Sequence, residues 1–510
     1  MEALRLAERV AHMISVVDAL LPTIILSVSA LLTIPILDVI RRRDNKHRSL
    51  VVIWVAVPFF AAALWTVHLA LRYFEVMDSN PFLFVSSSSG GREVLSSSFL
   101  IDAVSIYMVA VYLVMGFTSC LYSSLYIGFE EKSSERYFAL LLIVVGSVIA
   151  ATLSGDLLTL FIFWEASAAG SCFLIAYNGR ADSIEASLKY LIMIVIASGF
   201  IVYGLSIIYG LVGSLNFWSI REALTTLPDK TLLLFAFLFV AAGYAIETAV
   251  VPFHMWLPDA YTSASSSSAA FLSAIVDQAS YYVFMRVLLY ILTPPAVLNW
   301  PPALSIFSAI TMTVGNIFAL AQRNVKRMTS YVCIADIGYN LVAITSVKPL
   351  GIMGNLFFFF VGGMTTALAF MAVGVMNKLG IENLDDFSGV GKEMPLTSLA
   401  LTTAALSFSG VPPFAGFIAK YLVFTAAIEA GMAWLAVVGV LNSVLQSAYL
   451  LRLIHYMYGK KPKRLGLKEP KGILVPIYIA VIIITVLGLY PSLALEIIRP
   501  AANQLSILTP

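Results

Sequence analysis

The sequence predicts an all-α polytopic membrane protein with about fourteen transmembrane helices, each near the ~20 residues that a bilayer requires. Three observations support this fold class. The 510-residue chain is 60% hydrophobic and 12% charged, with a mean hydropathy of +0.91, unlike an ordinary soluble protein. Long apolar runs recur from end to end. The polar linkers are short, with the longest near residues 76–99 and 458–472, so no soluble domain is expected.

The expected spans follow the chain in order. Residues 1–14 are amphipathic, and no small-residue cleavage site follows the first apolar run, so we expect no cleavable signal peptide and a retained first helix. The spans are placed near residues 15–38, 50–74, 100–126, 137–153, 157–177, 187–211, 232–251, 268–292, 303–321, 328–346, 350–376, 396–426, 433–457 and 473–492.

Basic residues predict the orientation in the cell membrane. They gather in the loops after the first, ninth and thirteenth spans: Arg41, Arg42, Arg43, Lys46 and Arg48; Arg323, Lys326 and Arg327; and Lys460, Lys461, Lys463, Arg464, Lys468 and Lys471. Because basic loops stay on the cytoplasmic side, both termini are expected outside. Lipid or partner binding is the alternative role for these loops. The net charge of +2 gives no sign of nucleic-acid binding.

The cysteines and the remaining short motifs indicate no cofactor. Cys120, Cys172 and Cys333 lie far apart within apolar runs, without metal-like or redox-like spacing, and we expect buried thiols. Gly389–Lys392 lacks the spacing of a phosphate-binding loop. Nothing resembles a nucleotide, flavin, haem, iron–sulfur or tightly bound metal site.

A few ionisable residues interrupt the apolar runs, roughly one per helix: Glu165, Lys189, Glu247, Asp277, Asp336 and Lys420. Charges inside a bilayer are unfavourable, so such residues predict a functional site. The alternative for each one alone is a structural salt bridge or a helix-end anchor. A single salt bridge would need only two of them.

Buried acids and lysines linked by water can relay protons laterally. Burial favours the neutral acid and a nearby lysine favours its ionised form, so movement of the lysine switches the acid between holding and releasing a proton. Glu165 and Lys189, on adjacent helices, are the expected acid–base pair. A histidine side chain can titrate near neutrality, so His254 would either gate proton entry or satisfy backbone carbonyls freed by Pro252.

Two helices are predicted to be broken, at Val251–Pro252 in the seventh span and at Gly410–Pro413 in the twelfth. Matching breaks in two halves indicate an inverted-repeat transporter. The breaks lie five spans apart, as do Glu165 and Asp336. We therefore divide the chain into residues 1–126 (spans 1–3), 127–292 (first repeat, spans 4–8), 293–457 (second inverted repeat, spans 9–13) and 458–510 (basic loop and final helix).

Several segments between residues 100 and 455 resemble a known family. They are the Leu-Leu-Thr-Leu-Phe run into Trp164-Glu165, Lys189-Tyr190, Val251–Ala260, Asn324–Arg327, Ile337-Gly338 and Gly410–Lys420. The chain resembles the antiporter-like membrane subunits of Mrp-type cation/proton antiporters, respiratory complex I, and membrane-bound hydrogenase or sulfane-reductase-type archaeal complexes. The resemblance implies a fourteen-helix fold with inverted repeats and a hydrophilic axis at the membrane midplane. It also implies Glu165 and Lys189 as the proton-handling pair, with Lys420 on the second broken helix.

The chain departs from this family at its central positions. Where the family usually carries lysine, histidine or Ala-Pro, this sequence carries Glu247, Asp277, Asp336, Gly362, Thr366 and Ala264-Ser265. Acids in place of bases reverse the local electrostatics. Such a site would hold protons more tightly, bind Na⁺ through Glu247 or Asp277, or no longer conduct, and the residues leave these outcomes open.

The leading hypothesis is an ion-translocating subunit, moving H⁺ or exchanging Na⁺ for H⁺, in a multisubunit redox-driven or Mrp-like complex. Its partners would be other membrane subunits and the lipid bilayer. Whether that complex is an oxidoreductase stays open, and any redox cofactors would lie in partner subunits. The second hypothesis is a non-conducting structural subunit that has lost the lysine relay. A stand-alone transporter or a quinone reductase is less favoured.

Overall fold

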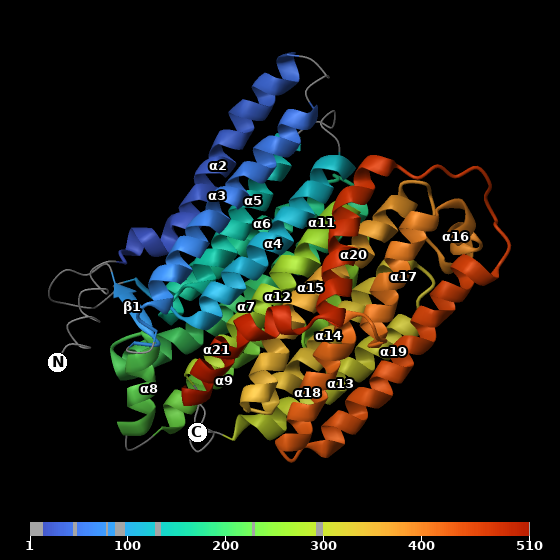
Figure 1. Cartoon of the computed structure of the whole chain (residues 1–510). Coiled ribbons are helices and arrows are strands. Elements are labelled where there is room, and N and C mark those ends of the chain that lie inside the picture. The colour runs from blue at the N-terminus through green and yellow to red at the C-terminus, as the bar shows by residue number, and fades with distance from the viewer. Residues whose placement is uncertain are drawn as a thin grey trace.

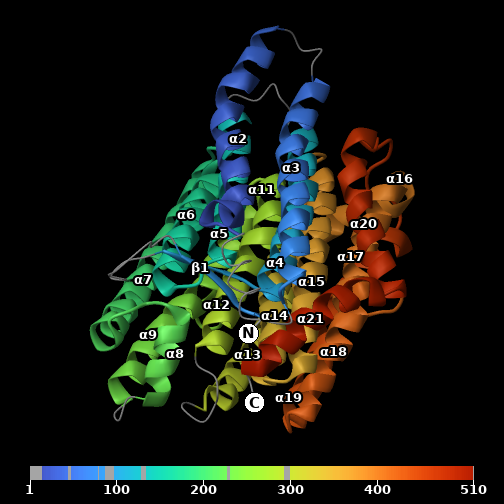
Figure 2. The same cartoon turned by 60° about the vertical axis from the view of Figure 1, so that its left-hand side comes forward.

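The structure, a computed structural model, describes residues 14–43, 48–77, 80–86, 97–127, 134–226, 230–291 and 299–508. Its long helices form one bundle (Figures 1 and 2). Ten of the helices in these ranges are long and apolar enough to cross a membrane, which confirms an all-helical membrane protein. Most of the amphipathic stretch expected at residues 1–14, together with Lys46, lies outside the described residues.

The N-terminal third is built of long helices and one short hairpin. Their bounds are α2 (Val16–Arg43), α3 (Arg48–Phe74), β1 (Leu83–Ser86), β2 (Ser98–Ile101), α4 (Ala103–Tyr126), α5 (Ser134–Thr152), α6 (Leu157–Ala176) and α7 (Ala181–Val212). The strands pair antiparallel, with Leu83 opposite Ile101. Helices α2 and α3 project beyond the rest of the bundle at one end (Figures 1 and 2). Strand β1 lies inside the linker expected near residues 76–99, β2 crosses the end of that linker, and the pair was not predicted.

The middle of the chain contains the first broken helix. Its elements are α8 (Phe217–Thr226), α9 (Thr231–Glu247), the 3₁₀ turn η2 (Phe253–Met255), α10 (Trp256–Ser263), α11 (Ser266–Phe271), the π-helical turn η3 (Leu272–Val276) and α12 (Asp277–Tyr290). Helix α9 ends at Glu247, and the Val251–Pro252 bond is cis. Ala249 adopts a positive φ of 53°, so the chain leaves helical geometry at the predicted break.

The C-terminal half contains the second broken helix. Its elements are α13 (Trp300–Ala321), α14 (Val325–Thr345), α15 (Pro349–Asn377), η4 (Leu384–Phe387), α16 (Val390–Glu393), α17 (Pro395–Ser409), α18 (Ala415–Glu429), α19 (Ala433–Gly459), η5 (Lys471–Ile473), α20 (Leu474–Leu489) and α21 (Ser492–Leu508). Gly410 ends α17 in the left-handed region at φ 69°, and the Pro412–Pro413 bond is cis. The single span expected at 396–426 is therefore two helices.

One C-terminal helix was missed by the sequence analysis. The final part was expected to hold one helix, but α21 follows α20 and packs against α4 and α15. Its buried residues Ala494, Ile498, Ala501 and Leu505 recur at helical spacing on one face. An amphipathic helix of this kind has no continuous apolar run, which explains why hydropathy did not reveal it.

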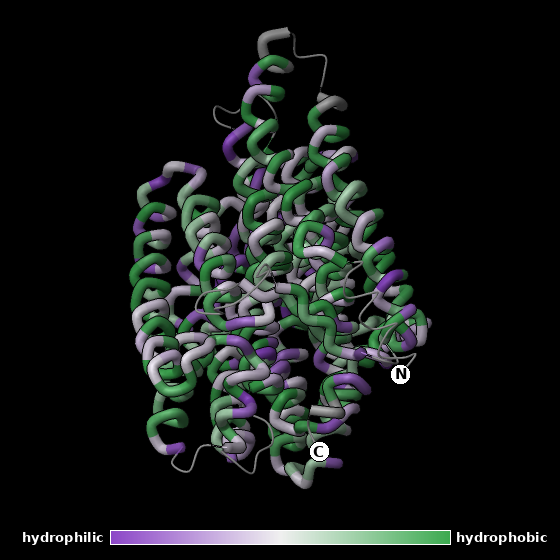
Figure 3. Tube along the Cα trace, turned by 90° about the vertical axis from the view of Figure 1, so that its left-hand side faces the viewer, coloured by the Kyte–Doolittle hydropathy of each residue, from purple (hydrophilic) through white to green (hydrophobic). Residues whose placement is uncertain are grey.

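Close helix–helix packing encloses the centre of the bundle. A Cβ at Gly338 of α14 would lie 2.5 Å from the Met312 backbone nitrogen of α13, so only glycine permits this approach. Among the ten candidate spans in the described residues, α15 is the most enclosed, with 94% of its apolar window buried. Hydrophobic residues cover most of the length of the outer helices, as Figure 3 shows. The polar side chains inside the bundle are thereby separated from lipid.

Candidate functional site

The two helix breaks each place one ionisable residue inside the bundle. Glu247 is the last residue of α9 and only 3% exposed, whereas Lys420 lies in the second turn of α18 and is 5% exposed. Glu247 therefore stands at the partially negative C-terminal end of a helix. Lys420 stands beside the C-terminal end of α17, across the second break. The two breaks therefore place an acid and a base in comparable positions.

Lys420 is fully engaged. Its ammonium donates to the Phe408 carbonyl at 2.7 Å, to Gln446 Oε1 at 2.6 Å and to Ser443 Oγ at 3.2 Å. It also lies 4.1 Å from the centre of the Tyr339 ring, a cation–π distance. Because Phe408 belongs to the last turn of α17, the lysine charge stabilises the carbonyl end of that half-helix.

Glu247 has no such partners. Neither of its carboxylate oxygens makes a hydrogen bond with a described residue. The Trp164 indole and the Glu165 carboxylate are its electrostatic neighbours, with the indole outside hydrogen-bond geometry. An ionised Glu247 would thus face a second acid and a helix C-terminus, without a counter-ion. Addition of a proton or a monovalent cation removes that repulsion.

The expected pairing of Glu165 with Lys189 is not found. Glu165 accepts a hydrogen bond from Ser198 at 2.7 Å, while the Lys189 ammonium binds Glu185 at 2.9 Å and Asp259 at 3.2 Å. Ser198 and Lys189 are nine residues apart on α7, about 13 Å along the helix axis. Adjacent helices were predicted correctly, but Lys189 lies at a different depth from Glu165.

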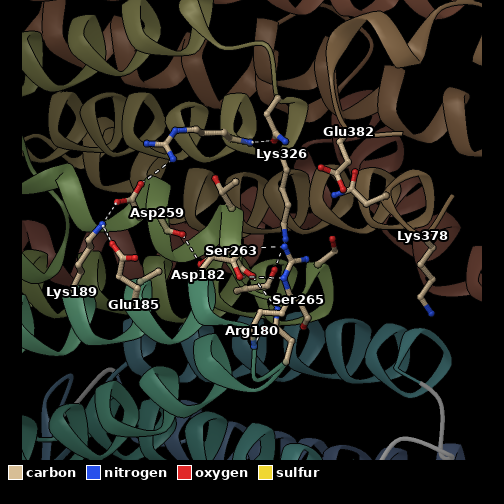
Figure 4. A pocket seen from close by; sticks show the side chains of 18 of the residues that line it. Arg180, Asp182, Glu185, Lys189, Asp259, Ser263, Ser265, Lys326, Lys378 and Glu382 are labelled. Atoms are coloured by element: carbon tan, nitrogen blue, oxygen red, sulfur yellow. Dashed lines mark hydrogen bonds and ion pairs between the residues drawn. The ribbon is translucent and has the colours of Figure 1, made fainter. Parts of the chain in front are cut away.

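Lys189 instead lines a polar pocket of about 630 Å³ at one end of the bundle. In Figure 4, Lys189, Glu185 and Asp259 lie together on one side, with Lys378 and Glu382 on the other. Arg327 donates to Asp259 at 2.9 Å, so the Asp259 carboxylate is shared by two cations. Side chains of both charges line this pocket, which we name the vestibule.

Lys326 differs from its expected role as a loop residue. It lies in the first turn of α14, is 6% exposed, and donates to the Ala264 carbonyl at the end of α10. Its charge therefore stabilises the junction between α10 and α11. From the sequence, Arg323, Lys326 and Arg327 form one basic cluster after the ninth span. The cluster alone does not show which of its side chains is buried.

Asp277 and Asp336 lie deeper, on α12 and α14. Asp277 accepts a hydrogen bond from the Tyr261 hydroxyl. A small cavity of about 10 Å³ lies between the two acids, and a second of about 10 Å³ lies between Asp336 and Lys420. Each is near the lower limit for one water molecule. Asp336 lines both cavities and links the first half of the chain to Lys420.

Tyr190 connects the two halves of this polar path. Its hydroxyl is buried and lies within electrostatic range of both Glu247 and Asp277. We name the resulting series the polar axis. It consists of Glu165, Glu247, Asp277, Asp336 and Lys420 in spatial order.

His254 lies beside the first break. It is 5% exposed, its ring stacks on Phe318 with centroids 6.2 Å apart, and neither ring nitrogen makes a hydrogen bond of good geometry with a described residue. Gly362 and Thr366 lie on α15. Gly362 lines the cavity beside Lys420, and Thr366 lines the one between the two aspartates.

A fully buried ion pair between Arg286 and Asp102 was not predicted from the sequence. The Arg286 guanidinium lies 3.5 Å from Asp102, and both side chains have 0% exposure. Asp102 caps α4 by accepting from the Ser105 backbone at 2.7 Å, and Arg286 packs on the Tyr290 ring at 4.6 Å. The arginine within the apolar run 268–292 was a signal that could have found it. Within the described ranges, no group of three or more His, Cys, Asp or Glu residues could hold a metal ion.

The chain is similar in sequence to a known family of membrane proteins. The family described as NADH:quinone oxidoreductase/Mrp antiporter, TM, matches residues 154–446. The chain is 34% identical over 419 residues to NADH-quinone oxidoreductase subunit N of Trichlorobacter lovleyi, covering 80% of this chain and 84% of that protein. It is 31% identical over 427 residues to F(420)H(2) dehydrogenase subunit N of Methanosarcina mazei, covering 81% and 86%. 

A solved structure shares the fold as well. One chain of the archaeal membrane-bound sulfane sulfur reductase superposes with a TM-score of 0.81 at 25% identity, covering 95% of this chain and 97% of that chain. The two relatives match about four fifths or more of this chain and of their own length, and the structural neighbour matches nearly the whole of both chains.

Proposed function

The chain belongs to the NADH:quinone oxidoreductase/Mrp antiporter transmembrane family, and on this premise we propose that it is an ion-translocating subunit. The ions would be H⁺, with or without exchange for Na⁺. The polar axis is the single observation that supports conduction best. It carries a titratable group on each of five helices, and water-sized cavities lie on both sides of Asp336.

Along the polar axis, a proton would neutralise one unpaired acid after another. A proton entering through the vestibule at Lys189 and Asp259 would reach Glu247, whose ionised form has no partner, and would be shared with Glu165. Tyr190 and the Tyr261 hydroxyl would carry it to Asp277. His254 would regulate access at the first break.

The second half would complete the transfer. Asp336 faces Lys420 across a cavity, and Gln446 is a neighbour of both, because its Oε1 accepts from Lys420 and its side chain also lies near the Asp336 carboxylate. A proton arriving at Asp336 removes the charge that attracts the ammonium. Lys420 would then release its proton toward the far side, and the two states of the pair would alternate.

The finer architecture is also part of this proposal. We propose fourteen spans, with two inverted five-helix repeats at residues 127–292 and 293–457, a preceding unit at 1–126 and a following one at 458–510. The basic loops would face the cytoplasm and both termini the outside. The paired breaks after α9 and α17 support the repeats.

The partners are other subunits of a membrane complex, as they are for the relatives and the structural neighbour. We propose that this complex is related to complex I, Mrp antiporters or archaeal membrane-bound complexes, and that its redox cofactors, where present, lie in other subunits. A non-conducting structural role is the second candidate. The acids at positions 247 and 277, where the family resemblance implies bases, favour it.

The test uses the assembled complex in proteoliposomes. A potential is imposed with K⁺ and valinomycin, and H⁺ and ²²Na⁺ fluxes are recorded for wild type, Glu165→Gln, Glu247→Gln and the exposed-acid control Glu222→Gln. Conduction predicts that both axis variants reduce flux by at least about ten-fold relative to the control. Equal fluxes in all four proteins would establish the structural role instead.

A further inference from the structure

The cavity between Asp277 and Asp336 is lined unusually densely by oxygen-bearing side chains. Six of its lining residues carry one: Asp277, Gln278, Tyr281, Asp336, Asn340 and Thr366. They come from α12, α14 and α15, three helices of different parts of the chain. The cavity measures about 10 Å³, so a hydrated ion does not fit.

Several of these oxygens have no donor. Asp336 Oδ1, Gln278 Oε1 and the Tyr281 hydroxyl make no hydrogen bond with any described residue, and Asp336 and Gln278 are only 4% and 6% exposed. Thr366 uses its hydroxyl hydrogen on the Gly363 carbonyl at 3.0 Å, which leaves its lone pairs available. Buried acceptors without donors are uncommon in native proteins and indicate a missing partner.

The charges of the side chains around the cavity indicate the valence of the ion that would balance them. With both acids ionised, Asp277 and Asp336 contribute two negative charges, and Lys420 beyond Asp336 contributes one positive charge. The deficit is therefore one positive charge. Since unbalanced charge in a low-dielectric interior is strongly unfavourable, a monovalent cation balances the site and a divalent one does not.

The number of oxygens distinguishes a metal cation from a proton. One carboxylate oxygen is enough to hold a proton, whereas a hard metal cation binds several carboxylate, amide and hydroxyl oxygens at once. Amide and hydroxyl oxygens supply four of the six candidate ligands here. A cluster of this kind is distinct from the His, Cys and carboxylate sites of transition metals.

We propose that this cavity binds one dehydrated Na⁺ between Asp277 and Asp336. This proposal rests on the proposed ion-translocating function. It places the Na⁺ of that function in the cavity between the two aspartates. Na⁺ entry displaces the proton from Asp336, so one cation enters as one proton leaves. Because Asp336 also faces Lys420, exchange of its proton for Na⁺ leaves an ionised carboxylate beside the ammonium, which couples the site to the second half of the polar axis.

Na⁺ binding to the purified complex tests the proposal, measured by equilibrium dialysis with ²²Na⁺. Three variants alter the cavity: Asp336→Asn removes a charge, Thr366→Val removes a hydroxyl at equal size, and Gln278→Met removes an amide at similar size. Thr345→Val is the matched control, because Thr345 is buried on α14 but donates only to the Val342 carbonyl. Gel filtration checks assembly of each complex.

The expected result is loss of one bound Na⁺ per complex in Asp336→Asn. In Thr366→Val and Gln278→Met we expect affinity weakened about ten-fold or more, the equivalent of one lost ligand contact. The control binds as wild type. Equal stoichiometry and affinity in all five proteins overturns the Na⁺ site and leaves an ordered water only.

Loss of the sodium site and loss of conduction are separable. Proton flux that persists in a Na⁺-free buffer, together with unaltered ²²Na⁺ binding in the variants, rejects the sodium site and retains the proposed function. Absence of flux of either ion through the wild-type complex rejects the proposed function itself.

Discussion

Replacement of Lys420 by methionine is predicted to destabilise the second half of the bundle. The methionine keeps most of the volume but removes the donor to the Phe408 carbonyl and Gln446 Oε1. Each buried acceptor left unsatisfied costs about 1–3 kcal/mol, so two of them cost roughly 2–6 kcal/mol. Removal of a buried ammonium offsets part of this loss. A net destabilisation of about 3 kcal/mol is expected.

Thermal inactivation of the detergent-solubilised complex measures this effect as a rate, because large membrane assemblies unfold irreversibly. If the full 3 kcal/mol acts on the unfolding barrier, the half-life falls by roughly 100-fold. Thr425→Val is the control, since Thr425 lies on the same helix and donates only to the Tyr421 carbonyl. A Lys420→Met half-life within about two-fold of the control would refute the reasoning from these two hydrogen bonds.

Three further variants test other contacts by the same inactivation assay. Glu247→Lys places a cation at the α9 C-terminus beside Glu165 and is expected to gain about 1 kcal/mol and a longer half-life; a shorter one contradicts the electrostatics of the break. Arg286→Met breaks a fully buried ion pair and is expected to cost about 3–5 kcal/mol, part of which Asp102→Asn restores; independent, additive losses would exclude the pair. Gly338→Ala forces α13 and α14 apart and should cost about 1–3 kcal/mol, so wild-type stability would disprove the close approach.

Much of the fold was predictable from the sequence because the bilayer restricts the choices. Apolar runs predicted the ten long helices of the described residues that could cross a membrane, and Pro252 and Pro413 predicted the breaks after α9 and α17, since proline removes a backbone donor. The ionisable residues of the polar axis were identified one by one as charges inside apolar runs. Amphipathic α21 and the β1–β2 strand pair carried no such signal, because neither contains a long apolar run.

The pairing of the site residues was not predictable in the same way. Lys189 and Glu165 lie on neighbouring helices, but helix register decides depth, and sequence alone gave no register between α6 and α7. Ser198, Gln278 and Asn340 were missed because neutral polar residues occur in many membrane helices. Their importance comes only from the carboxylates that tertiary packing brings beside them.

The central claim is that ions pass along the polar axis, and Asp336 is its most informative residue because it lines both cavities. The direct measurement is potential-driven H⁺ and ²²Na⁺ flux in proteoliposomes that contain the assembled complex, with Asp336→Asn compared with Thr345→Val on the same helix. Conduction along the axis predicts a loss of at least about ten-fold in Asp336→Asn and none in the control. A correctly assembled Asp336→Asn complex that carries both ions at the wild-type rate would contradict the account.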